Sequence, residues 1–493
     1  MGALVGTFRA SYLSALACVG SFLFAYDTGI IGGVLTLPSF VRDFHTGNNT
    51  NVSSNSTSLL QAGAFFACFF AWPFTARFGR RITIMLASLI FCIGAVIQVA
   101  PTHSLAAFYV ARVISGVGVG VATVIVPMYT VEMAPKEIRG KLGSLFQFFF
   151  TLGVMTSYWV DYGVSKHVAG TSSAQWQIPV GLQLVPGGIL GLGMLLTKES
   201  VRWLATQKRE EEALQSLIWV RGQDTPAVRE EFEEILNSIR EEELLTEGYS
   251  IKELWLPINR YRVALIIAIQ IGVQLTGNTS LAYYAPQVFT AIGAGANNLF
   301  FTGFFGVAKV VACGIFVLFM IERFGRRWSL IGGAFAMGSF MLIVALIVKT
   351  HPPSATAIAG GGIQPTSIAA VVMIYLEAMA YNMSWGPVPW VYMAEIMPSR
   401  IREGAVAIGT ATQWLFNFAF SQITPHAVKN LGWRTFLMFF IFNWSLAIFA
   451  FFLIKETKGK SIEEVDAIFN DRPVVSYNDA KDAKNPVTSQ TEV

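Results

Sequence analysis

The sequence predicts an all-helical membrane protein with twelve transmembrane segments arranged as two related halves of six. Three observations predict this fold: the composition, a series of long apolar segments, and two loop motifs that occur once in each half. Of the 493 residues, 53% are hydrophobic and 13% are charged, and the mean hydropathy is +0.52. A soluble domain carries about 25% charged residues, so most of this surface must contact lipid or other helices.

Charge and cysteine usage exclude several other classes of protein. The net charge of +4 gives no reason to expect a nucleic-acid partner. The first apolar run, from about Ala10 to Leu35, is longer than the ~7–15 residues of a signal-peptide core and carries Asp27, so it is expected to remain as a helix. The cysteines all lie inside apolar stretches and are expected to be reduced and buried: Cys18, Cys68, Cys92 and Cys313.

The twelve segments follow from length and hydropathy. A helix that crosses the hydrocarbon needs about 20 largely apolar residues, and helices are expected because lipid offers backbone groups no hydrogen-bond partner. The expected segments start near Tyr12, Leu59, Ile82, Leu105, Leu142 and Ile178 in the first half, and near Val263, Leu299, Ser329, Ser367, Gly404 and Thr435 in the second.

Composition also divides the chain. We expect a six-helix half over residues 1–197, a linker over 198–260, a second half over 261–455 and a tail over 456–493. The linker mixes Glu, Arg and Lys with apolar residues at helical spacing, which is typical of amphipathic helices in water. The tail has one helical stretch, "SIEEVDAIF", followed by polar sequence.

Basic residues predict the orientation in the membrane. Lys and Arg gather after segments two, four, eight and ten and in the tail, which places those loops and both termini in the cytoplasm. We expect the membrane to be the plasma membrane. The loop after segment one is then outside. It contains three Asn-x-Ser/Thr sequences in a polar run, which are expected to be glycosylated: Asn48, Asn51 and Asn55.

Two loop motifs recur in the same place in each half. "ARFGRR" at Ala76–Arg81 returns as "ERFGRR" at Glu322–Arg327, and "VEMAPKEIRG" at Val131–Gly140 returns as "AEIMPSRIREG" at Ala394–Gly404. General anchoring of helices would explain the positive charge of these loops but not the repeated spacing. A repeat of six helices in the same orientation is typical of transporters whose two halves surround a central site.

These motifs carry a resemblance to the sugar-porter family of the major facilitator superfamily along nearly the whole chain. Several stretches, such as "QAGAFFACFF", look most like its fungal branch, which includes quinate and sugar-acid carriers. The matching motifs are "FAYDTGIIGG", "RFGRR" twice, "PMYTVEMAPKEIRG", "KESVRWL", "QLTGNTSLAYY", "WGPVPWVYMAEIMPSRIR" and "KETKGKSIEEV". The sequence departs from the family's pattern at Ala76, Lys198, Val201 and Lys455, and it has Asn278 one place before the family's Asn.

Asp27 is an ionisable residue in the middle of the first segment, and such residues are costly in hydrocarbon and typical of an ion or substrate path. Arg112, on segment four, resembles the family's partner of that Asp. Protonation of Asp27 would release Arg112 and so couple transport to a proton. The alternative is a static structural ion pair. Because uniporters of this family commonly have Asn at the Asp27 position, we favour proton symport.

The substrate of such a carrier offers hydroxyl groups, which amides match as both donors and acceptors, and a ring face, which Trp matches. Any one buried amide can instead hold helices together, but candidates from both halves favour a shared central site. The expected substrate-binding residues are Gln147, Gln274, Asn278, Asn382, Trp390, Gln413 and Asn417. Lys309, inside segment eight, either meets a substrate carboxylate or pairs internally, and the sequence leaves both open.

Charged residues of the cytoplasmic loops are expected to form a charge network that breaks during inward opening. Its members can pair with their counterparts in the other half or with each other. They are Arg77, Arg81, Glu132, Arg139 and Glu199 in the first half, and Arg323, Arg327, Glu395, Arg402 and Glu456 in the second.

The sequence therefore predicts a secondary active transporter that takes up a monosaccharide, polyol or sugar acid by proton symport, acting as a monomer in the lipid bilayer. An uncoupled uniporter and a quinate or galacturonate carrier remain as alternatives, and a nutrient sensor is disfavoured by the short tail. We expect no enzyme activity, cofactor or metal, because the five histidines have no metal-ligand spacing and no nucleophile has a base nearby.

Overall fold

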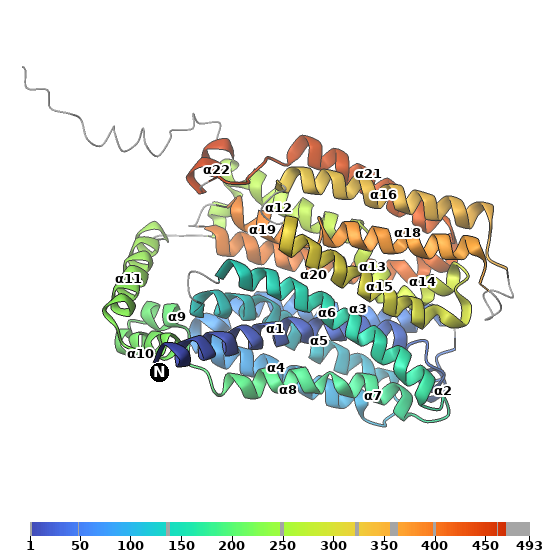
Figure 1. Ribbon diagram of the computed structural model, residues 1–493, viewed down its shortest axis with the longest axis horizontal. Coiled ribbons are helices and arrows are strands. Elements are labelled where there is room, and N and C mark those ends of the chain that lie inside the picture. The colour runs from blue at the N-terminus through green and yellow to red at the C-terminus, as the bar shows by residue number, and fades with distance from the viewer. Residues whose placement is uncertain are drawn as a thin grey trace, which may run out of the picture.

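A computed structural model describes residues 2–47, 49–134, 139–246, 251–320, 325–354, 363–397, 401–460 and 462–469. Within these residues the regular structure is entirely helical. The long helices run side by side along the longest axis of the molecule (Figure 1). The first half comprises α1 (Gly2–Val34), α2 (Pro38–Asp43), α3 (Thr50–Phe78), α4 (Arg80–Val99), α5 (Leu105–Met133), α6 (Arg139–His167), α7 (Ala174–Leu182) and α8 (Leu184–Met194).

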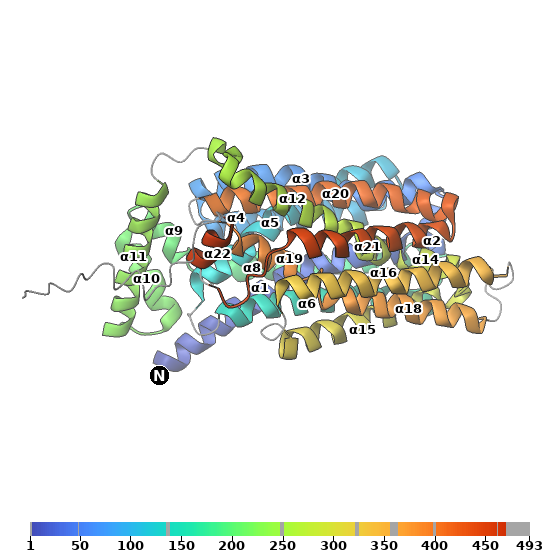
Figure 2. The ribbon, with the colours of Figure 1, turned by 90° about the horizontal axis from the view of Figure 1, so that it is seen from above.

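The linker forms helices beyond one end of the bundle. These are α9 (Val201–Thr206), α10 (Glu210–Arg221) and α11 (Pro226–Thr246), followed by a 3₁₀ turn at Ile251–Trp255. They lie at the same end as the N-terminus and α22 (Ile462–Phe469), as two perpendicular views show (Figures 1 and 2). We call this the linker end, and the opposite end, which carries α2, the loop end.

The second half repeats the arrangement of the first, with two of its segments interrupted. It comprises α12 (Pro257–Leu275), α13 (Asn278–Tyr283), α14 (Ala285–Ala291), a 3₁₀ turn (Gly295–Asn297), α15 (Asn298–Ile315) with a π-helical end (Phe316–Met320), α16 (Arg326–Thr350), α18 (Pro365–Asn382), α19 (Val388–Glu395), α20 (Arg402–Leu431) and α21 (Arg434–Leu453). Segment seven breaks at Gly277, whose φ of +85° suits glycine. Segment ten breaks between α18 and α19.

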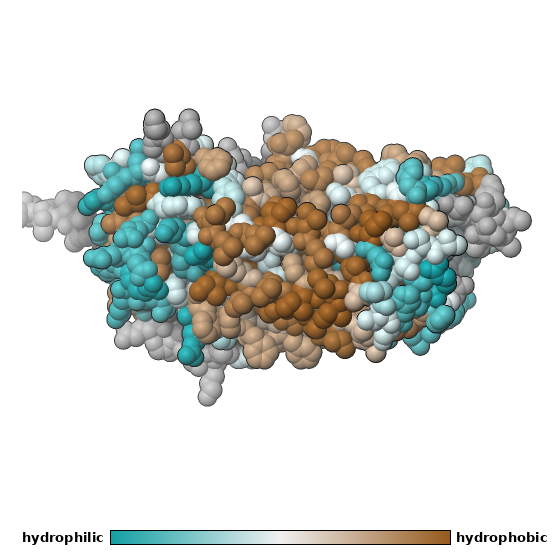
Figure 3. All heavy atoms as spheres, turned by 90° about the horizontal axis from the view of Figure 1, so that it is seen from below, coloured by the Kyte–Doolittle hydropathy of each residue, from teal (hydrophilic) through white to brown (hydrophobic). Residues whose placement is uncertain are grey.

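An apolar band covers the middle of the bundle on the face that Figure 3 shows. Nine helical spans among the described residues are long and apolar enough to cross a membrane. The helices α6, α18 and α20 pack among them and complete twelve segments. In Figure 3 hydrophobic residues cover the middle of the visible face and hydrophilic residues gather at both ends, as a bilayer requires. The predicted all-α fold of two six-helix halves is therefore confirmed.

The expected segment starts differ most at α1, which begins at Gly2 rather than near Tyr12, and at the second segment, where polar residues are buried. The second segment begins at Thr50 rather than near Leu59, because the intervening Ser and Thr residues continue the helix. Ser54, Ser56 and Thr57 are buried in this stretch, where α3 packs against α5 and α20. Hydropathy cannot detect polar residues that face neighbouring helices instead of lipid.

The halves meet along two helix pairs, α3 with α20 and α6 with α15. One large core cluster contains side chains of both halves near the loop end, while two further clusters lie within the individual halves. The contact between halves is thus most continuous toward the loop end.

Candidate functional site

A buried ion pair lies inside the first half. Arg112 Nη1 on α5 donates to Asp27 Oδ1 on α1 over 2.6 Å, and the side chains are 1% and 0% exposed. Arg112 Nε also donates to the backbone carbonyl of Ser56 on α3 over 2.9 Å. The second carboxylate oxygen of Asp27 and Nη2 of Arg112 have no hydrogen-bond partner within the described residues. The pair predicted from the sequence is thus present, and one polar atom of each side chain remains available for a further hydrogen bond.

Glycines on α5 bring this helix close to α3, whose Ser56 carbonyl accepts a hydrogen bond from Arg112. A Cβ atom on Gly116 would lie 2.1 Å from the carbonyl oxygen of Leu60, and one on Gly120 would lie 2.5 Å from that of Ala64. Real Cβ atoms do not approach so closely, so larger residues would push α5 away. The small residues that follow Arg112 on α5 therefore allow close packing of α5 against α3.

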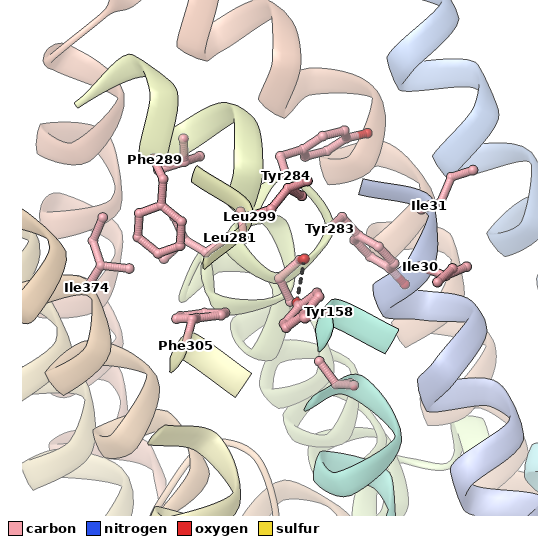
Figure 4. Close-up of a cluster of buried hydrophobic side chains, with 14 of the residues drawn as sticks. Ile30, Ile31, Tyr158, Leu281, Tyr283, Tyr284, Phe289, Leu299, Phe305 and Ile374 are labelled. Atoms are coloured by element: carbon pink, nitrogen blue, oxygen red, sulfur yellow. Dashed lines mark hydrogen bonds between the residues drawn. The ribbon is translucent and has the colours of Figure 1, made fainter. Parts of the chain in front are cut away.

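Polar side chains from both halves meet beside the ion pair. Asn417 Nδ2 on α20 donates to the Tyr283 hydroxyl on α13 over 3.4 Å. That hydroxyl also lies close to Gln61 and Thr28 of the first half. Figure 4 shows Tyr283 directed toward α1, which carries Asp27. The Gln61 side chain is fully buried at this point. The ion pair is thus next to a polar cluster that spans the interface between halves.

The loop-end side of this interface is closed. The Tyr158 hydroxyl on α6 donates to the Ala282 carbonyl over 2.7 Å, drawn as the dashed line in Figure 4. Gln422 on α20 donates to Asn55 and Ser58 on α3 over 2.9 and 2.6 Å. These bonds join the two halves, and they indicate a state closed toward the loop end.

A close backbone approach reinforces this closure. A Cβ atom on Gly32 of α1 would lie 2.2 Å from the carbonyl oxygen of Tyr283 on the other half. Gln287 Nε2 also donates to the Gly32 carbonyl over 3.3 Å. Ile30 and Ile31, on the same turn of α1, lie beside Tyr283 in Figure 4. The backbone of α1 at Gly32 is therefore in direct contact with the second half.

The other predicted amides lie in different environments. Gln274, at the end of α12, is buried, and both of its amide atoms lack a partner in the described part of the chain. Asn382 on α18 donates to the Ala378 carbonyl of its own helix over 2.7 Å. Gln147 on α6, Trp390 on α19 and Gln413 on α20 are half-buried. Gln274 is thus the predicted binding residue with most unused capacity.

Lys309 belongs to a second buried charge cluster. Its Nζ donates to Asn278 Oδ1 over 3.0 Å, and Asn278 Nδ2 donates to Glu377 Oε2 over 3.0 Å. The three side chains come from α15, α13 and α18 and are 4% exposed or less. We call them the Lys309 cluster. The sequence left two alternatives open for Lys309, a substrate carboxylate or an internal partner. In this state Lys309 has an internal partner, Asn278.

Two buried acids were missed by the sequence analysis. Glu377 stands inside the apolar run "MIYLEAMAYN", which is the same signal that identified Asp27. Asp161 on α6 is fully buried, and neither of its carboxylate oxygens has a partner among the described residues. Its position near the end of a segment makes the sequence signal weaker.

The charge network occurs twice at the linker end, once in each half. Arg80 Nη2 pairs with Glu132 over 3.0 Å, and Arg326 Nη2 pairs with Glu395 over 2.7 Å. Glu199 accepts hydrogen bonds from the backbone N–H groups of Arg80 and Arg81. Glu456 accepts those of Arg326 and Arg327 in the same way. Each acid therefore caps the N-terminus of a helix, α4 or α16, where carboxylates are favoured.

Of the two pairings that the sequence left open, the ion pairs among the described residues run within each half. The arginines that form them are Arg80 and Arg326, which were not among the expected members. Arg81 instead donates to the carbonyls of Met194 and Leu195, and Arg327 to that of Phe451. Arg77 lies over the ring of Phe78. Arg323 and the side chains of Arg139 and Arg402 lie outside the described residues.

Two of the three predicted glycosylation sites, Asn51 and Asn55, lie at the loop end. Asn48 lies outside the described residues. Asn51 and Asn55 were expected in a loop, but they lie in the first turns of α3. Asn51 Oδ1 contacts His426 Nε2 over 2.9 Å, and Asn55 accepts from Gln422.

The loop end also holds an acid that stays ionised. Although its burial has the opposite effect, hydrogen bonds from Ser173, Trp176 and Arg42 lower the pKa of Asp43 to about 2. Asp43 thereby ties α2 to α7, because Trp176 Nε1 donates to Asp43 Oδ2 over 2.8 Å. Within the described residues there is no group of His, Cys, Asp and Glu that could hold a metal ion.

Two six-helix halves, broken helices in segments seven and ten and a polar interface define the chain as a transporter of the major facilitator fold. Its sequence matches the family described as "Sugar (and other) transporter" over residues 13–469, so the chain belongs to this family. It is a transporter and not an enzyme.

Named relatives agree with this assignment. The chain is 35% identical to a quinate permease of Emericella nidulans, over 95% of this chain and 90% of that protein. It is 36% identical to a probable quinate permease of Aspergillus flavus, over 94% and 88% of the two chains.

Solved structures support the fold. The proton:xylose symporter XylE bound to 6-bromo-6-deoxy-D-glucose is 26% identical, with a TM-score of 0.74, over 94% of this chain and 100% of that one. The inward-open conformation of XylE from E. coli is 26% identical, with a TM-score of 0.76, over 93% and 99%.

Proposed function

We propose that this chain is a proton-coupled importer of a small polyhydroxylated solute, with quinate as the first substrate to test. The observation that carries this proposal is the Asp27–Arg112 pair, with its 2.6 Å bond and almost complete burial. The relatives named quinate permeases support the substrate, and the XylE neighbour named a proton:xylose symporter supports the coupling.

The ion pair acts as the proton switch. When Asp27 is ionised its charge balances that of Arg112, and the buried pair is neutral. A proton on Asp27 removes the attraction and leaves Arg112 held by the Ser56 carbonyl alone. The free Nη2 of Arg112 and Oδ2 of Asp27 then allow new partners. A buried ion that loses its counter-ion is costly, so protonation favours a different helix arrangement.

The polar cluster links this switch to the substrate. Tyr283 and Asn417 belong to the second half, whereas Gln61 and Thr28 lie on the same side as Asp27. Amides bind sugar-like hydroxyls because each offers a donor and an acceptor, and Gln274 has no hydrogen-bond partner for either group among the described residues. Substrate bound here contacts both halves and responds to their relative movement.

The linker end faces the cytoplasm in this proposal, as the positive-inside rule requires. The loop end is then outside, and the state described here is closed toward the exterior. Alternating access requires the loop-end contacts, such as that of Gln422 with Ser58, to open. The charge network of each half holds its linker-end helices in place during this movement.

Uptake by yeast cells that lack their own transporters tests the proposal. Labelled quinate, galacturonate, hexoses, pentoses and polyols are supplied at about pH 5 and about pH 7.5. We expect saturable uptake of quinate that is faster at the lower pH and collapses with a protonophore. Uptake that a protonophore leaves unchanged means an uncoupled uniporter, and uptake of none of these solutes refutes the proposed substrate class.

A further inference from the structure

The Lys309 cluster places two opposite charges inside the second half without direct contact between them. Asn278 stands between them, accepting from Lys309 and donating to Glu377. Glu377 Oε1 has no hydrogen-bond partner among the described residues. A structural ion pair in low dielectric would gain most from direct contact, so an arrangement through a neutral amide leaves both charges only partly satisfied.

The surroundings keep water out of the cluster. Lys309 Nζ also lies 5.3 Å from the centre of the Phe305 ring, on the same helix. Phe305, Leu281 and Ile374, three or four residues from the three cluster members, belong to one buried apolar core drawn in Figure 4. An unbalanced charge in such a place is costly, so the total charge of the cluster decides what can bind there.

Among the described residues, few other ionisable groups lie near Glu377. Lys309 approaches from α15, Tyr283 lies on α13, and Tyr381 lies one turn further along α18. The charged residues of α16, which also packs along α18, stand only at its ends: Arg326, Arg327 and Lys349. Lys309 is therefore the cation that balances Glu377.

The total charge of the Lys309 cluster changes when an anionic substrate or a proton binds. With Lys309 and Glu377 both ionised the cluster is neutral, and an anionic substrate at Lys309 brings it to one negative charge. One proton on Glu377 restores neutrality, and Asn278 can then leave Glu377 without exposing a charge. Asn278 follows the break at Gly277, so it lies where segment seven can bend, four residues from the unsatisfied Gln274.

We propose that Lys309 binds the carboxylate of the substrate and that Glu377 takes up a proton with each anion bound. This inference deepens the proposed function and rests on it: it assigns the substrate to the class of carboxylated polyols and adds a proton site in the second half. Neutral analogues need neither Lys309 nor the proton on Glu377.

Binding of quinate is compared with that of its methyl ester, which has the same ring and no charge. The purified full-length chain is reconstituted in lipid nanodiscs, and the ratio of the two Kd values is measured at about pH 5.5 and about pH 7.5. The ratio cancels effects that the two ligands share, including that of Asp27. In the wild type we expect quinate to lose affinity relative to the ester as the pH rises.

The variants separate the two roles. Lys309→Met is expected to raise the Kd of quinate by roughly 10- to 100-fold, as loss of a charged hydrogen bond does. The Kd of the ester is expected to stay unchanged. Glu377→Gln is expected to make the ratio independent of pH, at its low-pH value. The double variant K309M/E377Q carries no unpaired buried charge, so it tests the loss of quinate selectivity even if Lys309→Met folds poorly.

Control variants exclude indirect effects. Lys349→Met removes a lysine of the same half that stands over Trp433 outside the cluster, and Asn443→Leu removes a buried amide that donates only to backbone carbonyls. Neither is expected to change the ratio. An unchanged ratio in both Lys309→Met and the double variant overturns this inference alone, as does a pH-dependent ratio in Glu377→Gln. A wild type that binds neither ligand overturns the proposed function as well.

Discussion

Arg112 and Asp27 lie 2.6 Å apart with the carboxylate wholly buried, yet each retains a polar atom with no partner among the described residues. A pair serving only stability would be expected to satisfy these atoms, since each buried polar group left unpaired costs about 1–3 kcal/mol. The unused capacity suits a pair that changes partners. Three further features lead to predictions about movement and stability: the close approach at Gly32, the charge network and Asp43.

Replacing Asp27 by Asn is expected to abolish accumulation of substrate against a gradient while exchange across the membrane continues. Asn cannot exchange a proton, so Arg112 keeps one state throughout the cycle. Counterflow and proton-driven uptake in proteoliposomes measure the two activities separately. Asp43→Asn is the control, because Asp43 stays ionised over the working range. Full proton-driven accumulation by Asp27→Asn would show that the pair is structural.

Replacing Gly32 by Val is expected to hold the loop end open. The added side chain would collide with the Tyr283 carbonyl, which lies 2.2 Å from an ideal Cβ position. Spin labels at the exposed positions Thr171 and Lys429, one on each half, should move apart, and uptake should fall. Gly163→Val, where no atom lies within 4 Å of the added Cβ, should change neither. Equal label distances in both variants would contradict closure at this point.

The two copies of the charge network are expected to differ in strength. The Arg80–Glu132 side chains are 15% and 9% exposed, against 22% and 27% for Arg326–Glu395. Because water screens exposed pairs, double-mutant cycles should give a coupling of about 1–3 kcal/mol in the first half and less in the second. Thermal unfolding of Gln variants in detergent measures both, and Arg77 should show no coupling to Glu132. A stronger pair in the second half would contradict this order.

Asp43 is expected to stabilise the loop end only above acidic pH. Its pKa in the folded chain is about 2, below the ordinary 3.8. A depressed pKa gives stability that is complete above the ordinary value and is lost as the pH falls toward 2. Asp43→Asn should therefore lower Tm at neutral pH, by the equivalent of about 1–3 kcal/mol, and this difference should shrink below about pH 4.

The exposed acid Glu212, paired with Arg209 at the surface, is the control for this measurement. Glu212→Gln should leave Tm nearly unchanged at every pH, since exposed pairs contribute little. A loss of Tm in Asp43→Asn that does not depend on pH would mean that shape, and not charge, holds α2 against α7.

The sequence predicted the fold well because lipid imposes strong constraints on composition and length. Twelve segments and two halves follow from apolar runs and repeated loop motifs. Asp27 follows from the rarity of charges in hydrocarbon, and Arg112 as its partner follows from the resemblance to the sugar-porter family. The early start of α3 at Thr50 could not be predicted in this way, because hydropathy does not distinguish a polar residue in water from one packed between helices.

Which charged residues contact one another was harder to predict from the sequence than which residues belong to the site. Arg80 and Arg81 are adjacent and chemically identical, yet one side chain reaches Glu132 and the other the carbonyls of Met194 and Leu195. Successive residues of a helix point in different directions, and only the packed structure shows which partner each one meets. Glu377 was detectable by the rule that found Asp27. Its connection to Lys309 was not, since it depends on how Asn278 is placed after the break in segment seven.

The central claim is that solute and proton cross together, and proton movement measures it most directly. Proteoliposomes that contain the full chain and an internal pH-sensitive dye receive quinate outside, with no initial pH gradient. We predict acidification of the interior that saturates with quinate and is absent in Asp27→Asn liposomes. Uptake of labelled quinate by the same liposomes with no change in internal pH would contradict the account.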